Sequence, residues 1–122
     1  MEQMSEAVTV RPSSFDDLES VRELIFLTID RCYSDVYPRR AVRFFKDFHS
    51  EKEITRRHTE GHTLVLEREG QIVGTGALVG SMITAVFVHP DYQGHGYGRA
   101  LMRSLEERAV SRSLVHIELD IS

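Results

Sequence analysis

The chain has 122 residues, of which 41% are apolar and 28% charged, and its formal net charge is −4 at pH 7. These values are ordinary for a water-soluble globular protein, and we expect one domain over residues 1–122. No apolar run approaches the ~20 residues of a membrane helix, and a negative chain is a poor general binder of nucleic acid, so both classes are excluded. The polar N-terminus and the single cysteine, Cys32, predict a cytoplasmic protein.

Hydrophobic spacing in the first half of the chain predicts one strand followed by three helices. Pro12 ends the strand, and Ser13 or Ser14 caps the first helix. A loop that carries Tyr33 and Tyr37 follows that helix. The predicted elements are a strand over 8–11, a helix to about residue 30, a loop over 33–38, a short helix with Val42, Phe45 and Phe48 on one face, and a helix from 51 to about 59 that Gly61 ends.

The second half predicts three consecutive strands, a glycine-rich loop, a helix and a last strand. Glu69 and Gly70 form the two-residue turn of a hairpin, and Gly80 and Ser81 turn into the next strand. The predicted strands cover 63–67, 71–79, 82–88 and 115–121, and the helix after the glycine loop carries Leu101, Met102, Leu105 and Ala109 on one stripe.

The segment V-H-P-D-Y-Q-G-H-G-Y-G-R, residues 88–99, is the most informative part of the sequence. An apolar strand is cut off by Pro90, three glycines follow at alternating positions, and a helix begins. The first turn of a helix presents backbone N–H groups without carbonyl partners, and its positive dipole end attracts anions. Gly94, Gly96 and Gly98 leave no side chain between this backbone and a phosphate group. The alternative interpretation is a tight turn without a ligand.

Two known nucleotide motifs fit this loop poorly. The spacing is G-x-G-x-G rather than G-x-G-x-x-G, and no acidic residue follows at the end of a second strand. A Walker loop needs Lys and then Ser or Thr after its last glycine, whereas Arg99 and Ala100 stand here. A phosphate-binding nucleotide module is therefore the third of our three hypotheses.

The same loop resembles a known family. Gln93-x-x-Gly96-x-Gly98 is similar to the Gln/Arg-x-x-Gly-x-Gly/Ala signature of the GNAT superfamily of acetyl-CoA-dependent N-acetyltransferases. The flanking residues 87–92 and 99–102 are similar too. The order of predicted elements agrees with that fold through its fifth strand. The resemblance implies an α/β (α+β) fold, with a GNAT-like mixed central sheet flanked by helices.

The resemblance also implies acetyl-CoA as the co-substrate. In that family, amides of the loop hold the pyrophosphate of coenzyme A, and the preceding strand pairs with the pantetheine arm and polarises the thioester carbonyl. By position, these roles fall on Gln93, Gly94, His95, Gly96, Tyr97, Gly98 and Arg99 for the phosphates, and on Val86, Phe87 and Val88 for the arm and the carbonyl.

The predicted reaction is transfer of an acetyl group to a primary amine of a small molecule or peptide. An alkyl ammonium has a pKa of roughly 10, so a base must take its proton before the nitrogen attacks. Strand 82–88 has no carboxylate, and the candidate base is Glu118, with Asp120 as the other choice. Tyr33 and Tyr37 are candidates to line the acceptor pocket. Without a paired Cys and His, direct attack is favoured over a covalent enzyme intermediate.

No metal site is predicted. His58 and His62 stand four residues apart, but Gly61 interrupts the helix that would carry them.

The chain stops where members of the family usually continue with a helix, often bearing a tyrosine, and a final hairpin. We therefore expect the fold to lack these last elements. The uncovered sheet edge predicts a homo-oligomer, such as a dimer. A truncated natural protein, a shortened expression fragment and a subunit that another chain completes are the three explanations. They lead to the second functional hypothesis, a catalytically impaired, truncated GNAT domain that binds coenzyme A or serves as an association module.

Overall fold

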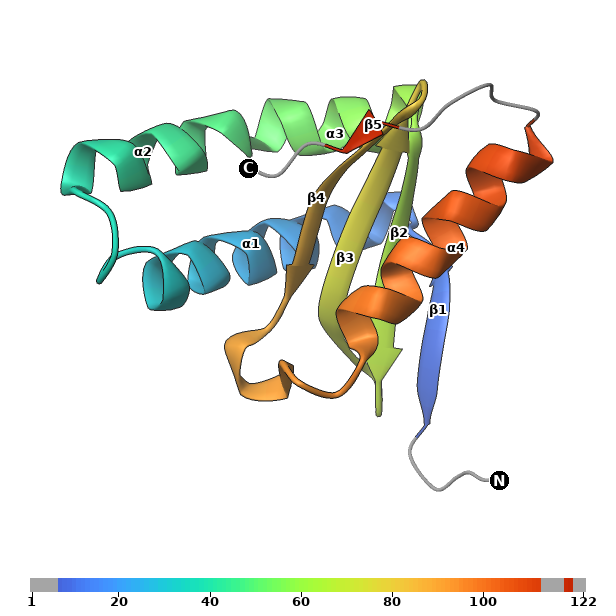
Figure 1. The fold of residues 1–122 in the computed structure, drawn as a ribbon, viewed down its shortest axis with the longest axis horizontal. Helices are drawn as coiled ribbons and strands as arrows, with labels where there is room; N and C mark the ends of the chain where they lie inside the picture. The colour runs from blue at the N-terminus through green and yellow to red at the C-terminus, as the bar shows by residue number, and fades with distance from the viewer. Residues whose placement is uncertain (1–6, 113–117, 120–122) are drawn as a thin grey trace.

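A computed structural model describes residues 7–112 and the backbone of 118 and 119. Its elements form one five-stranded sheet with helices on both faces (Figure 1). They are β1 (Val8–Pro12), the 3-10 turn η1 (Phe15–Asp17), α1 (Leu18–Cys32), α2 (Arg39–Phe48), α3 (Glu51–Glu60), β2 (His62–Arg68), β3 (Gln71–Val79), β4 (Met82–Val88), the 3-10 turn η2 (Pro90–Tyr92), α4 (Tyr97–Ser111) and β5 (Glu118–Leu119).

The strands stand in the sheet in sequence order, β1-β2-β3-β4-β5. The first four are antiparallel, and β5 runs parallel to β4, where its two described residues pair with Met82 and Ile83. This mixed sheet flanked by helices confirms the predicted fold class. The predicted strand over 115–121 is seen at 118 and 119, and its other residues lie outside the described part of the chain.

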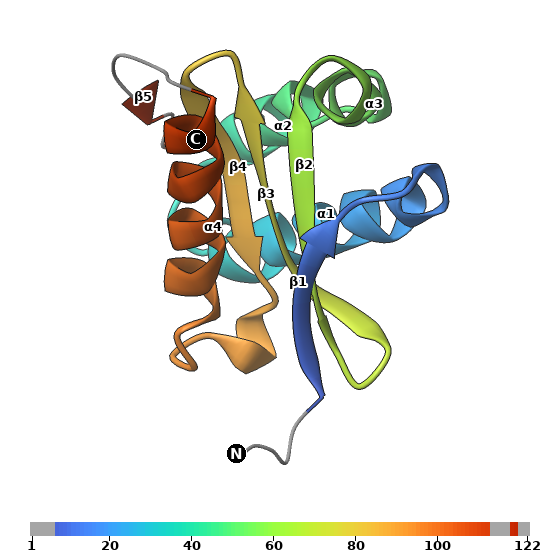
Figure 2. The same ribbon diagram turned by 90° about the vertical axis from the view of Figure 1, so that its right-hand side faces the viewer.

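Two hydrophobic layers hold the helices to the sheet, one on each face. Helices α1, α2 and α3 cover one face and α4 covers the other (Figure 2). Leu101 and Leu105 of α4 pack on Leu66, Val73 and Leu78, and all five side chains are buried. On the other face, Val21, Ile25 and Ile29 of α1 and Val42 of α2 pack against Val65, Ala85 and Phe87. Strand β4 contributes to both layers, with Ile83 on the α4 side and Ala85 and Phe87 on the α1 side.

The first helix begins later than predicted. Ser14 precedes the short turn η1 rather than α1 itself, because the carboxylate of Asp17 accepts the backbone N–H of Ser14 at 2.7 Å and the Ser14 hydroxyl at 3.0 Å. Helix α3 begins after a side-chain cap, since Ser50 Oγ accepts the N–H of Glu53 at 3.3 Å. Among the described residues, we find no helix with both the length and the apolar character that crossing a membrane requires.

Candidate functional site

The glycine loop opens directly into α4. Gly94 and Gly96 have φ values of +85° and +83°, and Gly96 is the N-cap residue of the helix. A Cβ atom on either glycine would meet no atom within 4 Å, so the space outside both is open. The helical bonding starts with Ala100 N–H donating to Gly96 O at 3.0 Å. The amides of Gly98 and Arg99 precede it and therefore have no acceptor inside the helix.

Aromatic side chains fix the shape of this loop. His95 Nδ1 lies 2.9 Å from the carbonyl oxygen of Tyr92. Because a carbonyl only accepts, Nδ1 carries the proton in this bond. The His95 ring also stacks on Tyr97, with 5.3 Å between ring centroids. The side chain of His95 therefore stabilises the conformation of the loop, and this role is separate from any ligand contact of its backbone amide.

Gln93 ties the loop to the end of β4. Its side-chain Nε2 donates to the carbonyl oxygen of Val88 at 3.0 Å and approaches Cys32 Sγ, at the end of α1, at 3.8 Å. The amide side chain thus connects the loop with the end of β4 and with the distant end of α1. The carbonyl oxygen of Gln93 lies 3.3 Å from His95 Nδ1, and its backbone N–H is the group that the loop offers to a ligand.

The edge of β4 that faces away from β3 lies beside this loop. His89 N–H donates to Val73 O at 2.8 Å, and the pairs Gly74–Val88 and Thr75–Phe87 follow in register. Since hydrogen-bonded and non-bonded pairs alternate in antiparallel strands, the backbone groups of Val88 point to the open edge and those of Phe87 to Thr75. Phe87 is buried at 4% exposure on the α1 side. Of the strand residues predicted to contact the arm, Phe87 presents no backbone group to this edge.

A pocket of about 320 Å³ combines the loop with this strand edge. The side chains of Val86 and Val88 belong to the α4 side of the sheet. The residues that line the pocket are Val86, Val88, Tyr92, Gln93, Gly94, Gly96, Tyr97 and Gly98. Seven of the ten residues predicted to bind the coenzyme lie among them, namely Val86, Val88, Gln93, Gly94, Gly96, Tyr97 and Gly98.

Strand β4 has an irregular step at the top of this pocket. Thr75 pairs with Phe87 and Ala77 with Thr84, so Gly76 alone stands opposite two residues, Ala85 and Val86. Ala85 has a φ of +58°, a conformation that residues with a Cβ rarely adopt. A Cβ on Gly76 would lie 3.0 Å from Leu105 Cδ1 and 3.3 Å from Val86 Cγ2, so any larger residue there would require both side chains to shift. The bulge turns the backbone of β4 away from the regular ladder at mid-strand.

The family resemblance implied a splayed point within strand 82–88, but the position of the bulge and its glycine were not found in the sequence, although one signal was present. Two glycines, Gly74 and Gly76, interrupt an otherwise apolar strand, and a glycine inside a strand indicates a bulge or a close approach. Nothing in the sequence marks Ala85, because alanine carries no preference for a positive φ.

The predicted acceptor residues lie on the other side of β4. Tyr33 packs against Tyr37 and Phe45, with ring centroids 5.7 Å and 5.0 Å away, and burial raises the pKa of its hydroxyl. Tyr37 is 44% exposed. The backbone of Glu118, the candidate base, pairs with Met82, three residues before Ala85, while its side chain lies outside the described part of the structure. His58 Nδ1 lies 2.8 Å from Ser13 Oγ, which accounts for that ring.

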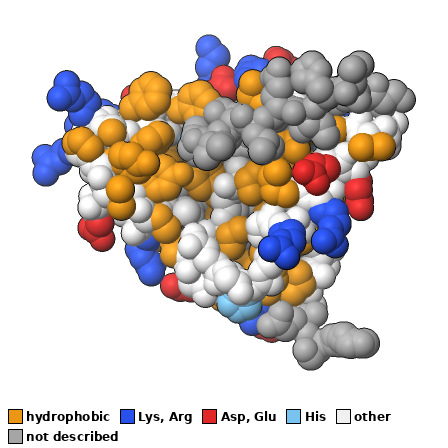
Figure 3. Space-filling model, viewed as in Figure 1, with side chains coloured by type: hydrophobic (Ala, Val, Ile, Leu, Met, Phe, Trp, Pro, Cys, Tyr) orange, Lys and Arg blue, Asp and Glu red, His pale blue; other side chains and the backbone are white. Residues whose placement is uncertain are grey.

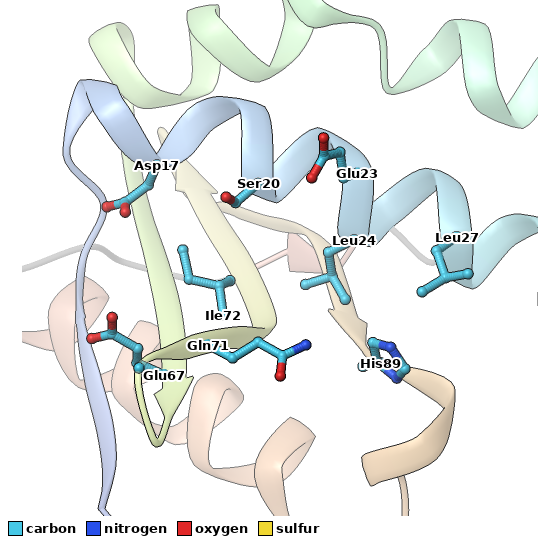
Figure 4. A pocket seen from close by; sticks show the side chains of 10 residues that line it. Asp17, Ser20, Glu23, Leu24, Leu27, Glu67, Gln71, Ile72 and His89 are labelled. Carbon is cyan, nitrogen blue, oxygen red and sulfur yellow. The ribbon is translucent and has the colours of Figure 1, made fainter.

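A second pocket, of about 440 Å³, lies between α1 and the β2–β3 turn (Figure 4). Three carboxylates, those of Asp17, Glu23 and Glu67, stand around a floor that includes Leu24 and Ile72. Arg11 pairs with Asp17 at 2.8 Å and with Glu67 at 3.1 Å, and the hydrogen bond from Arg11 lowers the pKa of Asp17 to about 2. Such a rim repels phosphates, so this pocket is the poorer place for an anionic coenzyme.

Comparisons with solved structures agree with this architecture. A GCN5-related N-acetyltransferase (Aminotransferase, Class-II) from Rhodopseudomonas palustris superposes with a TM-score of 0.85 at 25% identity, over 99% of this chain and 78% of that one. The PaiA N-acetyltransferase from Thermoplasma acidophilum, solved in complex with coenzyme A, gives a TM-score of 0.73 at 16% identity, over 88% of this chain and 75% of that one. The second likeness shows a shared fold.

Sequence comparisons point the same way. The mycothiol acetyltransferase of Amycolatopsis mediterranei (strain U-32) is 40% identical over 55 residues, which are 40% of this chain and 18% of that protein. The family model for the acetyltransferase (GNAT) family matches residues 22–122. That match takes in α1 to α4, the glycine loop and the bulged strand. From fold, loop and family model together, the chain belongs to the GNAT acetyltransferase family.

Proposed function

We propose that this protein transfers the acetyl group of acetyl-CoA to a primary amine of a small molecule or peptide. The observation that carries the proposal is the open backbone at Gly94 and Gly96, directly ahead of the α4 N-terminus. A residue with a side chain at either position would place that side chain in the space that we assign to the diphosphate. The family membership of the chain supports acetyl transfer as the reaction.

The residues around the pocket suit an extended coenzyme. We assign the pyrophosphate to the amides of residues 93–99, with the Gly98 and Arg99 amides at the helix start. The pantetheine arm would lie along the edge of β4 that no described strand covers beside Val86 and Val88, where Val88 presents its backbone N–H and Val86 its side chain. Acetyl-CoA supplies the activated acyl group when bound. The arm then leads from the loop toward the bulge at Ala85.

The bulge is the proposed place of reaction. A neutral amine attacks the thioester carbonyl there, a C–N bond forms, the C–S bond breaks, and the coenzyme leaves as a thiol that regains a proton. A backbone N–H at or after Ala85, released from the regular ladder, would stabilise the oxyanion. Glu118 remains the proposed base, directly or through water, because β5 pairs next to this part of β4.

A second function is favoured by one observation, the lack of any carboxylate in β4. In that case the protein binds coenzyme A without turnover. Thermal unfolding with coenzyme A, acetyl-CoA and ATP tests coenzyme binding, which both functions require. We expect the first two to raise the melting temperature and ATP to leave it unchanged. Thiol release with an amine panel then separates a catalyst from a binder. Equal stabilisation by ATP would contradict the coenzyme assignment.

A further inference from the structure

Four hydrophobic side chains, three of them aromatic, remain exposed on the side of β4 opposite the coenzyme pocket. Val36, Tyr37, Phe44 and Phe48 are 72%, 44%, 64% and 36% exposed, and we call these four residues the aromatic patch. Figure 3 shows hydrophobic side chains gathered over α2 and the segment before it. Single exposed apolar residues are normal, but a contiguous group indicates a binding surface.

The patch is connected to the bulge by packed rings. Phe48 contacts His49, and His49 contacts Phe87, with 5.0 Å between centroids in each pair. Phe87 stands two residues after Ala85, and both pack in the same buried cluster as Val42 of α2. The patch and the bulge therefore share the face of the sheet opposite the coenzyme pocket, and an acceptor that approaches from this face meets α2.

The charge beside the patch is positive. Arg40 stands one helical turn before Phe44, so the two are neighbours on the surface of α2. No ion pair formed within residues 7–112 involves Arg39, Arg40 or Arg43. Lys46, by contrast, is neutralised by Asp30 at 2.7 Å. Lys and Arg side chains border the hydrophobic area in Figure 3 at the outer end of α2. Within residues 33–48 these three arginines outnumber the exposed carboxylates of Asp35 and Asp47, so this surface attracts carboxylates and repels a polycationic amine.

From this juxtaposition we infer that the acceptor is an amine with an apolar or aromatic body and a carboxylate, such as a peptide with an apolar residue and an acidic one next to its free amine. The aromatic patch contacts the apolar body, and Arg40 contacts the carboxylate. The inference rests on the proposed function, because it needs acetyl-CoA on the other side of β4.

The test compares three tripeptides with free amines, Ala-Phe-Glu, Ala-Phe-Lys and Ala-Ser-Glu, together with spermidine, by thiol release at saturating acetyl-CoA. We expect kcat/KM for Ala-Phe-Glu to exceed the values for the other three acceptors by about ten-fold. Arg40→Glu should raise KM for Ala-Phe-Glu about ten-fold while KM for acetyl-CoA stays the same. Phe44→Ser should act likewise and should fold, since this side chain is largely exposed.

Arg108→Glu is the matched control, because it makes the same change of charge on α4, across the sheet. It should leave both KM values unchanged. A preference for Ala-Phe-Lys or spermidine, no preference, or no turnover of any acceptor by protein that binds acetyl-CoA would overturn the inference and leave coenzyme binding intact. A dimer that Phe44→Ser dissociates without changing acceptor preference would assign the patch to a second copy. Loss of acetyl-CoA binding itself would instead refute the proposed function.

Discussion

Two glycine turns of this protein share a backbone conformation but lead into different elements. Gly70 has a φ of +84° and Gly96 of +83°, and a Cβ on either would meet no atom within 4 Å. After Gly70 the chain continues as β3, whose amides pair with β2. After Gly96 it continues as α4, whose first amides have no acceptor in the helix. A glycine allows the turn in both places. Only the turn at Gly96 leads into a helix start, and this makes it the candidate anion site.

The surroundings of the two turns differ in charge as well. The β2–β3 turn borders the pocket that carries Asp17, Glu23 and Glu67. The pocket beside Gly96 is lined by valines, tyrosines, glycines and Gln93, with no carboxylate. An incoming diphosphate is therefore repelled at one turn and not at the other.

The largest expected effect separates the two turns directly. Gly96→Asp places a carboxylate in the proposed diphosphate space, and we expect the Kd for coenzyme A to rise by about 100-fold or more, because like charges brought together cost several kcal/mol. Gly70→Asp is the matched control, with the same residue at the same φ. Both variants should lose about 1 kcal/mol of unfolding free energy from the strained backbone. Calorimetric titration and urea unfolding provide the two measurements.

If Gly70→Asp weakened coenzyme binding as much as Gly96→Asp, the difference between the turns would have no functional meaning. An unchanged Kd for coenzyme A in Gly96→Asp would contradict the assignment of the loop to phosphate binding.

A smaller effect tests the side chain of Gln93 apart from its backbone. Gln93→Ala keeps the amide N–H and removes the 3.0 Å hydrogen bond to Val88 O. We expect the Kd for coenzyme A to rise about five-fold, because one hydrogen bond contributes about 1 kcal/mol to holding the loop in its binding shape. Gln71→Ala, at an exposed position after the β2–β3 turn, should leave the Kd unchanged. An unaltered Kd in Gln93→Ala would show that the loop holds its shape without this side chain.

The contrast between the turns also explains which features could be predicted. The spacing of glycines and the periodicity of apolar residues can be seen directly in the sequence. The glycine loop, the strands β2 to β4 and the apolar face of α4 were therefore predicted close to their observed bounds. The helix start after Gly96 was predicted for the same reason. These features depend on local chemistry, and one stretch of chain is enough to find them.

Features that depend on pairing between strands could not be predicted in this way. The bulge at Ala85 comes from the register of β4 against β3, and so does the turning of the Phe87 backbone toward Thr75. The side chain of Gln93 reaches Val88 and Cys32 only in the folded protein. Glu118 was selected as the base from its residue type alone, and it stays a prediction.

The smallest expected effect concerns the acidic side of the comparison. Arg11 holds Asp17 with hydrogen bonds of 2.8 and 3.2 Å, and these lower the pKa of Asp17 from 3.8 to about 2. A carboxyl whose pKa is lower in the folded state adds stability above its unfolded pKa and loses it as the pH falls through its folded pKa.

Asp17→Asn should therefore cost about 1 kcal/mol of unfolding free energy at pH 7, discounted for the exposure of Arg11. The difference from the wild type should shrink between pH 4 and pH 2 and be absent below that range. Urea unfolding at pH 7, 4 and 1.5 measures it, while the Kd for coenzyme A at pH 7 should not change. A difference that persisted at the lowest pH would mean that Asp17 stabilises the chain through its bonds to Ser14 rather than through its charge.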